Sequence, residues 1–163
     1  MIDFETTGFP WHNGCEVVTL GYFSGNDVVI TQRKTKDKIP FHKEISQILD
    51  GLHRPFYSYN TSFEKSVMKN VLGMDIRDGS LVDIMKPWKE KAEGKRLKWP
   101  KLDELISEPG DYFNDRKISG KDIPRLWGIY TKTGIESALT RIMEHCFSDM
   151  LREAILLLRY EQK

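Results

Sequence analysis

Two carboxylates lie close together at the start of the chain, where the stretch IDFET contains Asp3 and Glu5. The stretch is typical of a β-strand, in which alternate side chains point to the same face. Asp3 and Glu5 would then project together, while Ile2 and Phe4 project to the other side. Two anions held side by side predict a divalent cation between them, and the alternative is a pair of acids in contact with solvent.

A divalent cation needs further oxygen ligands, and two acids later in the chain qualify. Glu64 lies in the first turn of a predicted helix, where a carboxylate would also stabilise the helix dipole. Asp149 follows His145 by four residues, which places both on one helix face. This pair is either a base beside a metal ligand or two solvent-facing residues. Asp83, at the end of a predicted strand, is the substitute ligand if Glu64 faces away.

The elements that must position these residues follow a mixed α/β order. Strands are predicted at residues 1–5, 15–23, 27–32, 55–59 and 80–85. Helices are predicted at residues 40–53, 60–73, 101–106, 121–132 and 134–162, the last as one bent helix or two. The short SGN turn after residue 23 indicates a meander of the first three strands. The order predicts a mixed five-stranded sheet flanked by helices.

Composition excludes several classes of protein. The 163 residues suit one globular domain over residues 1–163, and the 39% of hydrophobic residues excludes a disordered chain. The apolar stretches are too short to span a membrane and the first residues lack a secretory pattern, so we expect no membrane association and a cytoplasmic location. Cys15 and Cys146 have no metal-binding spacing, which predicts reduced, partly buried thiols.

Residues 86–101 form a basic segment, although the net charge of the whole chain is only +1. Seven lysines and arginines stand against two glutamates in this segment, and Trp88 and Trp99 lie among them. Basic side chains neutralise phosphates and aromatic rings stack on unpaired bases, which makes the segment a candidate groove for single-stranded nucleic acid. The alternative is a solvated, lysine-rich loop.

Three motifs, taken in order, resemble a known family. IDFETTG is similar to the first motif of the DEDD (DnaQ-like) superfamily of 3′-to-5′ exonucleases, which have an RNase H-like fold. YNTSFEK resembles the second motif of that family and HCFSD the third. The C-terminal half is similar to the predicted RNase H-like exonuclease branch, in which a Gly, a Trp and a Tyr precede the third motif and an acid follows it. The resemblance covers nearly the whole chain.

The resemblance implies a metal-dependent 3′-to-5′ exonuclease that acts on single-stranded DNA or RNA ends with two divalent cations, Mg²⁺ or Mn²⁺. The residues it assigns to the metal are Asp3, Glu5, Glu64 and Asp149, with His145 as the general base. Those it assigns to the terminal nucleotide are Thr6, Thr7, Gly8, Asn60 and Phe63. The structural alternatives are a helix cap for Asn60 and a core position for Phe63.

Three features depart from the family pattern. Glu64 stands where most members have Asp, His145 stands at the spacing usual for a Tyr, and only two residues precede Asp3. They leave open a nucleic-acid-binding or assembly module of the same fold whose acids no longer turn over. A structure-selective endonuclease is a further alternative, and a protein partner is compatible with each of these functions.

Overall fold

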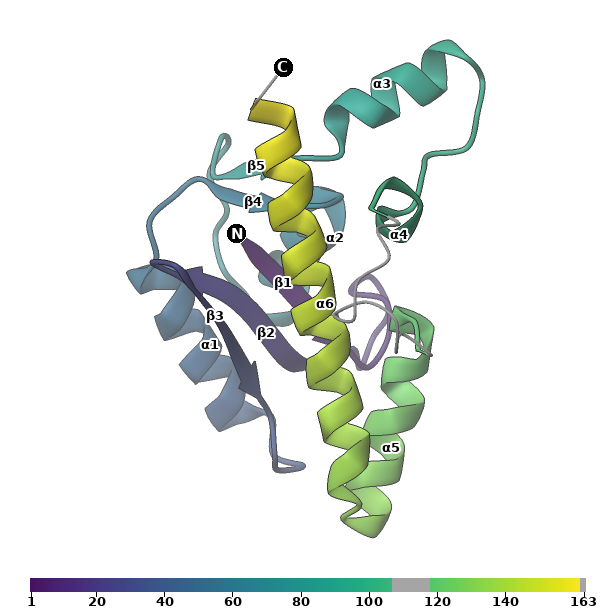
Figure 1. The fold of residues 1–163 in the computed structure, drawn as a ribbon. Coiled ribbons are helices and arrows are strands. Elements are labelled where there is room, and N and C mark those ends of the chain that lie inside the picture. Colours follow the sequence, from purple (N-terminus) through teal and green to yellow (C-terminus); the bar gives the residue numbers. More distant parts are fainter. Residues whose placement is uncertain (107–117, 162–163) are drawn as a thin grey trace.

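The computed structural model describes residues 1–106 and 118–161, whose arrangement is shown in Figure 1. The strands in this part of the chain are β1 (Ile2–Thr6), β2 (Val17–Ser24), β3 (Asp27–Gln32), β4 (Phe56–Ser58) and β5 (Leu81–Asp83). The α-helices are α1 (Ile39–Gly51), α2 (Thr61–Ser66), α3 (Lys86–Gly94), α4 (Leu102–Leu105), α5 (Ile123–Thr133) and α6 (Glu136–Glu161). A π-helical turn (Val67–Val71) continues α2, and a 3-10 turn (Gly120–Asp122) precedes α5.

The strands form two small sheets. β1, β2 and β3 pair antiparallel in that order, which confirms the predicted meander, and Gly25 forms the turn between β2 and β3 with a φ of 61°. β4 and β5 pair parallel to each other, with Phe56 opposite Leu81. The predicted five strands are therefore present, but no ladder joins the two sheets within the described residues. β4 and β5 have only three residues each, so they offer few backbone groups for further pairing.

Helices cover both faces of the three-stranded sheet (Figure 1). On one face, Phe41 and Ile45 of α1 pack against Ile2 and Phe4 of β1 in the largest apolar cluster. Helices α5 and α6 cover the other face, where they form a second cluster around Val18 of β2. The alternation of β1 thus buries its apolar residues under α1 and leaves its two acids for the α6 side.

Helix α6 is the longest element, and it crosses the sheet as one helix rather than two (Figure 1). It approaches β2 closely at Gly21, where a Cβ atom would lie only 2.7 Å from the sulfur of Cys146 and 2.9 Å from Cγ of Met150. The close approach brings the middle of α6 over β1 and β2. Neither α6 nor any other helix of the described ranges is apolar over a length that could cross a membrane.

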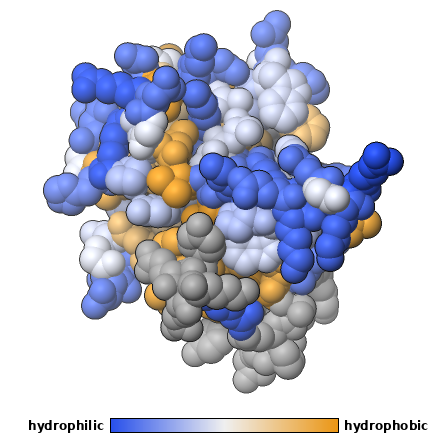
Figure 2. Space-filling view, turned by 90° about the horizontal axis from the view of Figure 1, so that it is seen from above, coloured by the Kyte–Doolittle hydropathy of each residue, from blue (hydrophilic) through white to orange (hydrophobic). Residues whose placement is uncertain are grey.

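Residues 86–94 form helix α3, where the sequence predicted a loop. Trp88 packs half-buried in a third apolar cluster around Ile84, Ile106 and Leu156, and Ala92, four residues later, is buried. One narrow apolar side thus holds a helix that is otherwise charged, which explains why hydrophobic periodicity did not reveal it. Seen from above, the face of the molecule that includes α3 is mainly hydrophilic (Figure 2).

Candidate active site

The two acids of β1 lie under α6, on the opposite side of the strand from the core residues. Asp3 pairs with Gly21 and Glu5 with Thr19 in the ladder to β2, so both positions face the helix that Gly21 allows to approach. Glu5 is buried, and Asp3 is partly exposed. The strand prediction is therefore confirmed: β1 presents its two carboxylates together at the interface with α6.

Helix α6 contributes His145 and Asp149 to the same place. Nε2 of His145 lies 3.6 Å from Oε1 of Glu5 and 3.7 Å from Oδ2 of Asp149, and His145 is only 7% exposed. The imidazole thus sits between a carboxylate of β1 and a carboxylate of its own helix. Arg152 approaches Asp149 at 3.9 Å, which adds a positive charge at this end of the group. The alternative of a solvent-facing His145–Asp149 pair is wrong for His145.

Glu64 reaches the site from the first turn of α2. Its N-cap residue, Asn60, has a left-handed φ of 65°, and this sharp turn directs the helix away from β4. Glu64 is buried; burial first, and the nearby charge of Asp3 second, raise its pKa well above the ordinary value. Its Oε2 atom has no hydrogen-bond partner among the described residues. Glu64 is therefore more than a stabiliser of the helix end, since it contributes a buried carboxylate beside Asp3.

The sequence offered Asp83 as a substitute ligand if Glu64 faced away. In the structure, Asp83 instead makes contacts that hold neighbouring elements. Its Oδ2 lies 2.6 Å from Nζ of Lys89, and its Oδ1 accepts hydrogen bonds from the backbone N–H groups of Asn60 and Met85. Nζ of Lys89 also donates to Oδ1 of Asn60 at 3.2 Å. This network holds the start of α2, and thereby the element that carries Glu64.

Glu153 is a buried acid of this group that the sequence reasoning did not single out. It is 3% exposed and lies one helical turn after Asp149 on α6. Burial, and then the charges of Asp3, Glu64 and Asp149, raise its pKa well above the ordinary value. The spacing 145, 149, 153 was visible in the sequence, and it was the signal that could have identified this residue.

The thiol of Cys146 also borders the acids, but the structure gives it a packing role. Ligand atoms of Asp3, Glu5 and Cys146 lie within 4.8 Å of one another. Burial, and then the charges of those two acids, raise the pKa of the thiol well above its ordinary value, so it stays protonated at neutral pH. Both cysteines are free, as predicted. Cys146 thus fills the space between α6 and β2.

The residues assigned to the terminal nucleotide make varied contacts within the protein. The hydroxyl of Thr6 donates to the carbonyl of Gly8 at 2.6 Å, and that of Thr7 accepts from the N–H of Glu16 at 3.0 Å, so both shape their own loop. Asn60 stands at the N-cap without a side-chain capping bond, and Phe63 packs half-buried against the largest apolar cluster. Their roles toward a nucleotide stay predictions.

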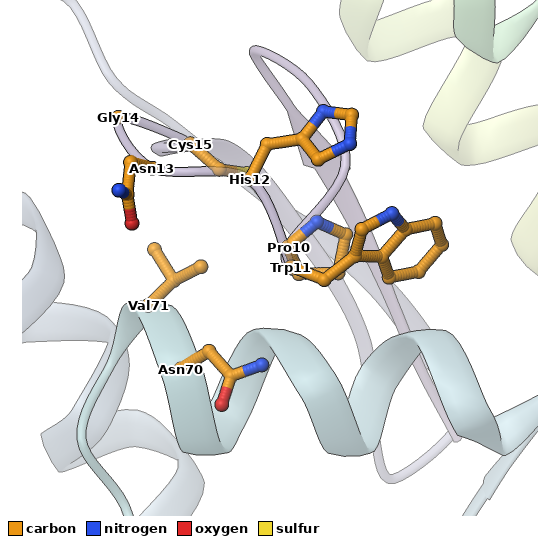
Figure 3. Close-up of a pocket in the computed structure, with 8 residues that line it drawn as sticks. All are labelled: Pro10, Trp11, His12, Asn13, Gly14, Cys15, Asn70 and Val71. Carbon is orange, nitrogen blue, oxygen red and sulfur yellow. The ribbon is translucent and has the colours of Figure 1, made fainter.

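The loop between β1 and β2 also borders a pocket of about 250 Å³. Figure 3 shows the loop residues 10–15 above the helical segment with Asn70 and Val71, which complete the lining. The rings of Phe9 and Trp11 stack in this loop with 4.9 Å between centroids, and both are about half exposed. The acids described above are not among the lining residues, so this pocket is separate from the carboxylate group.

The donor set fits a divalent cation. Carboxylate oxygens are the ligands that Mg²⁺ and Mn²⁺ prefer, whereas the protonated thiol offers no zinc site. Oε2 of Glu64 and Oε2 of Glu153 are buried without a hydrogen-bond donor among the described residues, an arrangement that costs about 1–3 kcal/mol per atom. A cation bound by these oxygens would remove that cost and offset the repulsion between the acids.

Comparison with known proteins adds the family. A family model described as the RNase_H superfamily matches residues 1–159, nearly the whole chain, whereas no curated protein and no solved structure gives a match. Membership of this superfamily indicates a nuclease that acts on nucleic acid, typically with divalent metals, and the acids of β1, α2 and α6 agree with that chemistry. The chain belongs to the RNase H superfamily.

Proposed function

We propose that this chain is a metal-dependent 3′-to-5′ exonuclease that removes nucleotides from single-stranded DNA or RNA ends. The observation that carries the proposal is a group of carboxylates from three elements, two of which lie within 4 Å of one imidazole. Asp3 and Glu5 come from β1, and Glu64 comes from α2. Asp149 of α6 lies 3.7 Å from the same Nε2 atom of His145 that Glu5 approaches. The order of the three motifs, which resembles that of the DEDD exonucleases, supports the exonuclease reading.

The proposed metal ligands are the four acids of these motifs, Asp3, Glu5, Glu64 and Asp149. Divalent cations held there would activate a water molecule and neutralise the charge that develops on the phosphate during hydrolysis. The four acids supply the negative charge that attracts such cations, and they lie in a largely buried part of the structure. Electrostatic interactions are stronger there than in bulk water.

His145 is proposed to accept the proton of the attacking water. Two carboxylate oxygens lie within 4 Å of its Nε2 atom, one from Glu5 and one from Asp149. Positive charge on the ring would therefore be stabilised as soon as the proton arrives. This placement supports a catalytic role for His145, although the residue occupies the spacing that the family usually gives to a Tyr.

The substrate strand is proposed to reach the acids past the β1–β2 loop and α3. A Cβ atom at Gly8 would meet nothing within 4 Å among the described residues, which leaves the backbone of this loop open to a nucleotide. On the other side, the half-exposed ring of Trp99 carries Nζ of Lys89 at 4.7 Å from its centroid. The exposed part of the Trp99 ring suits a stacked base, whereas Nζ of Lys89 is already paired with Asp83.

A cleavage time course tests the function. Single-stranded DNA and RNA labelled at the 5′ end would be incubated with the protein and Mn²⁺, Mg²⁺ or EDTA, beside a circular single-stranded DNA. Matched variants are Asp149→Asn, in the site, and Glu144→Gln, at an exposed position of the same helix.

We expect a metal-dependent ladder that shortens from the 3′ end with the wild type and Glu144→Gln, and none with Asp149→Asn. Cuts in the circular substrate would show an endonuclease instead. Intact substrates in every lane, with the label retained by the protein, would refute hydrolysis and favour a binding module.

A further inference from the structure

Glu153 occupies a position in the carboxylate group that the motifs do not account for. It lies one turn beyond Asp149 on α6, buried between that helix and the end of β4. Its Oε1 atom accepts a hydrogen bond from the backbone N–H of Tyr59 at 3.1 Å, across 94 residues of sequence. This bond fixes the direction of the carboxylate, so that only the other oxygen remains for a ligand.

That other oxygen, Oε2, is fully buried and has no hydrogen-bond partner among the described residues. The groups that interact electrostatically with Glu153 include Asp3, Glu64 and Asp149. A carboxylate in such company is repelled by its neighbours, and a buried acceptor without a donor is costly. The α-amino group of Met1 also interacts with Glu153, so a purely structural ion pair is the competing explanation.

The acids divide into two sets around the site. Ligand atoms of Glu5, His145 and Asp149 lie within 4.8 Å of one another and form the first set. Glu64 and Glu153 each bury an Oε2 atom without a hydrogen-bond donor among the described residues, and the charge of Asp3 acts on both, which links these three residues as the second set. Each set brings acids from different elements, and His145 borders the first set as the proposed base.

We propose that Glu153 is a metal ligand, which holds one divalent cation through Oε2 together with Asp3 and Glu64. This inference rests on the proposed function, because it adds a ligand to the same metal centre. The proposed ligand Glu153, from α6, also has the same side-chain length as Glu64, which stands where most members of the family have the shorter Asp. This cation would then be bound by three carboxylates, one each from β1, α2 and α6.

The substitution Glu153→Gln separates a ligand from a structural residue. The amide oxygen of Gln can still accept the hydrogen bond from Tyr59, and the side chain keeps nearly the same size. The negative charge at Oε2 is lost. The hydrogen bond from Tyr59 would therefore survive the substitution, and loss of an ion pair with Met1 would leave Mn²⁺ binding unchanged, whereas a metal site would be weakened.

Calorimetric titration of the metal-free full chain with MnCl₂ tests the inference, with electron paramagnetic resonance to count bound ions. The proteins are wild type, Glu153→Gln, Glu144→Gln and Asp149→Asn. We expect two bound Mn²⁺ ions in wild type and Glu144→Gln. In Glu153→Gln we expect one site to be at least about tenfold weaker, while the other keeps its affinity.

Unchanged affinities and stoichiometry in Glu153→Gln, with wild-type binding intact, would overturn the role of Glu153 and leave the proposed function standing. Absence of Mn²⁺ binding by the wild type would overturn both. The two failures are therefore distinguished by the wild-type titration alone. Circular dichroism of each variant confirms that a loss of binding reflects the site rather than unfolding.

Discussion

Gly21→Ala tests how the close contact between β2 and α6 sets the geometry of the site. A Cβ atom at this position would lie 2.7 Å from Sγ of Cys146, 2.9 Å from Cγ of Met150 and 3.3 Å from Cδ1 of Ile30. Contacts below 3.0 Å do not persist, so the side chains or α6 itself must move by several tenths of an ångström. Overpacking of this kind costs about 1–3 kcal/mol in the free energy of unfolding.

Removal of the nearest atom should relieve part of that cost. In the double variant Gly21→Ala/Cys146→Ala, the new methyl group takes some of the space left by the sulfur. We therefore expect the double variant to be more stable than the sum of the two single changes predicts, with a coupling energy of about 1 kcal/mol. Gly21→Ala alone should also weaken cleavage, because a displaced α6 carries His145 and Asp149 with it.

The assay is urea unfolding of metal-free wild type, both single variants and the double variant, followed by circular dichroism. Gly128→Ala is the control, since this residue lies inside α5 and a Cβ there meets nothing within 4 Å of it among the described residues. Its helix should gain about 1 kcal/mol. A Gly21→Ala protein as stable as the wild type, or strictly additive changes, would refute the argument about packing.

Three further predictions concern the acids and the basic segment. Because the pKa values of Glu64 and Glu153 are raised above 4.5 in the folded state, the metal-free protein should lose stability as pH rises from about 4.5. Glu64→Gln should reduce that loss and leave the part that Glu153 contributes; equal pH slopes for wild type and variant in thermal unfolding would contradict this prediction. Asp83→Ala should lower the free energy of unfolding in urea by about 2–3 kcal/mol, because it breaks the ion pair with Lys89. The variant should still bind two Mn²⁺ ions, since Asp83 is not a proposed ligand; loss of one ion would make Asp83 a ligand. Trp99→Ala should weaken binding of single-stranded oligonucleotides by about 1–3 kcal/mol, measured by fluorescence anisotropy, with little change in stability. Trp88→Ala should mainly destabilise the fold, because Trp88 packs in an apolar cluster. The reverse pattern would exclude this face as a binding surface.

The sequence predicted the relative placement of the acids better than it predicted the elements between the motifs. Strand alternation placed Asp3 and Glu5 on one face, and the helical spacing placed His145 beside Asp149, because both patterns depend only on local geometry. Helix α3 was missed because its apolar side is narrow. The spacing 145, 149, 153 placed Glu153 on the same helix side as Asp149, but its burial against Tyr59 joins residues 94 positions apart, and no local pattern contains that information.

The same distinction explains how this chain places its acids. Each element that carries a carboxylate is positioned by contacts outside the motifs. The ladder to β2 positions β1, the close approach at Gly21 positions α6, and the ion pair of Asp83 with Lys89 positions α2. The motifs supply charge, whereas these contacts supply position, and a metal centre needs both because ligand distances tolerate little error. Substitutions at these contacts should therefore reduce activity in proportion to displacement of the acids, even though none of the substituted residues is itself a metal ligand.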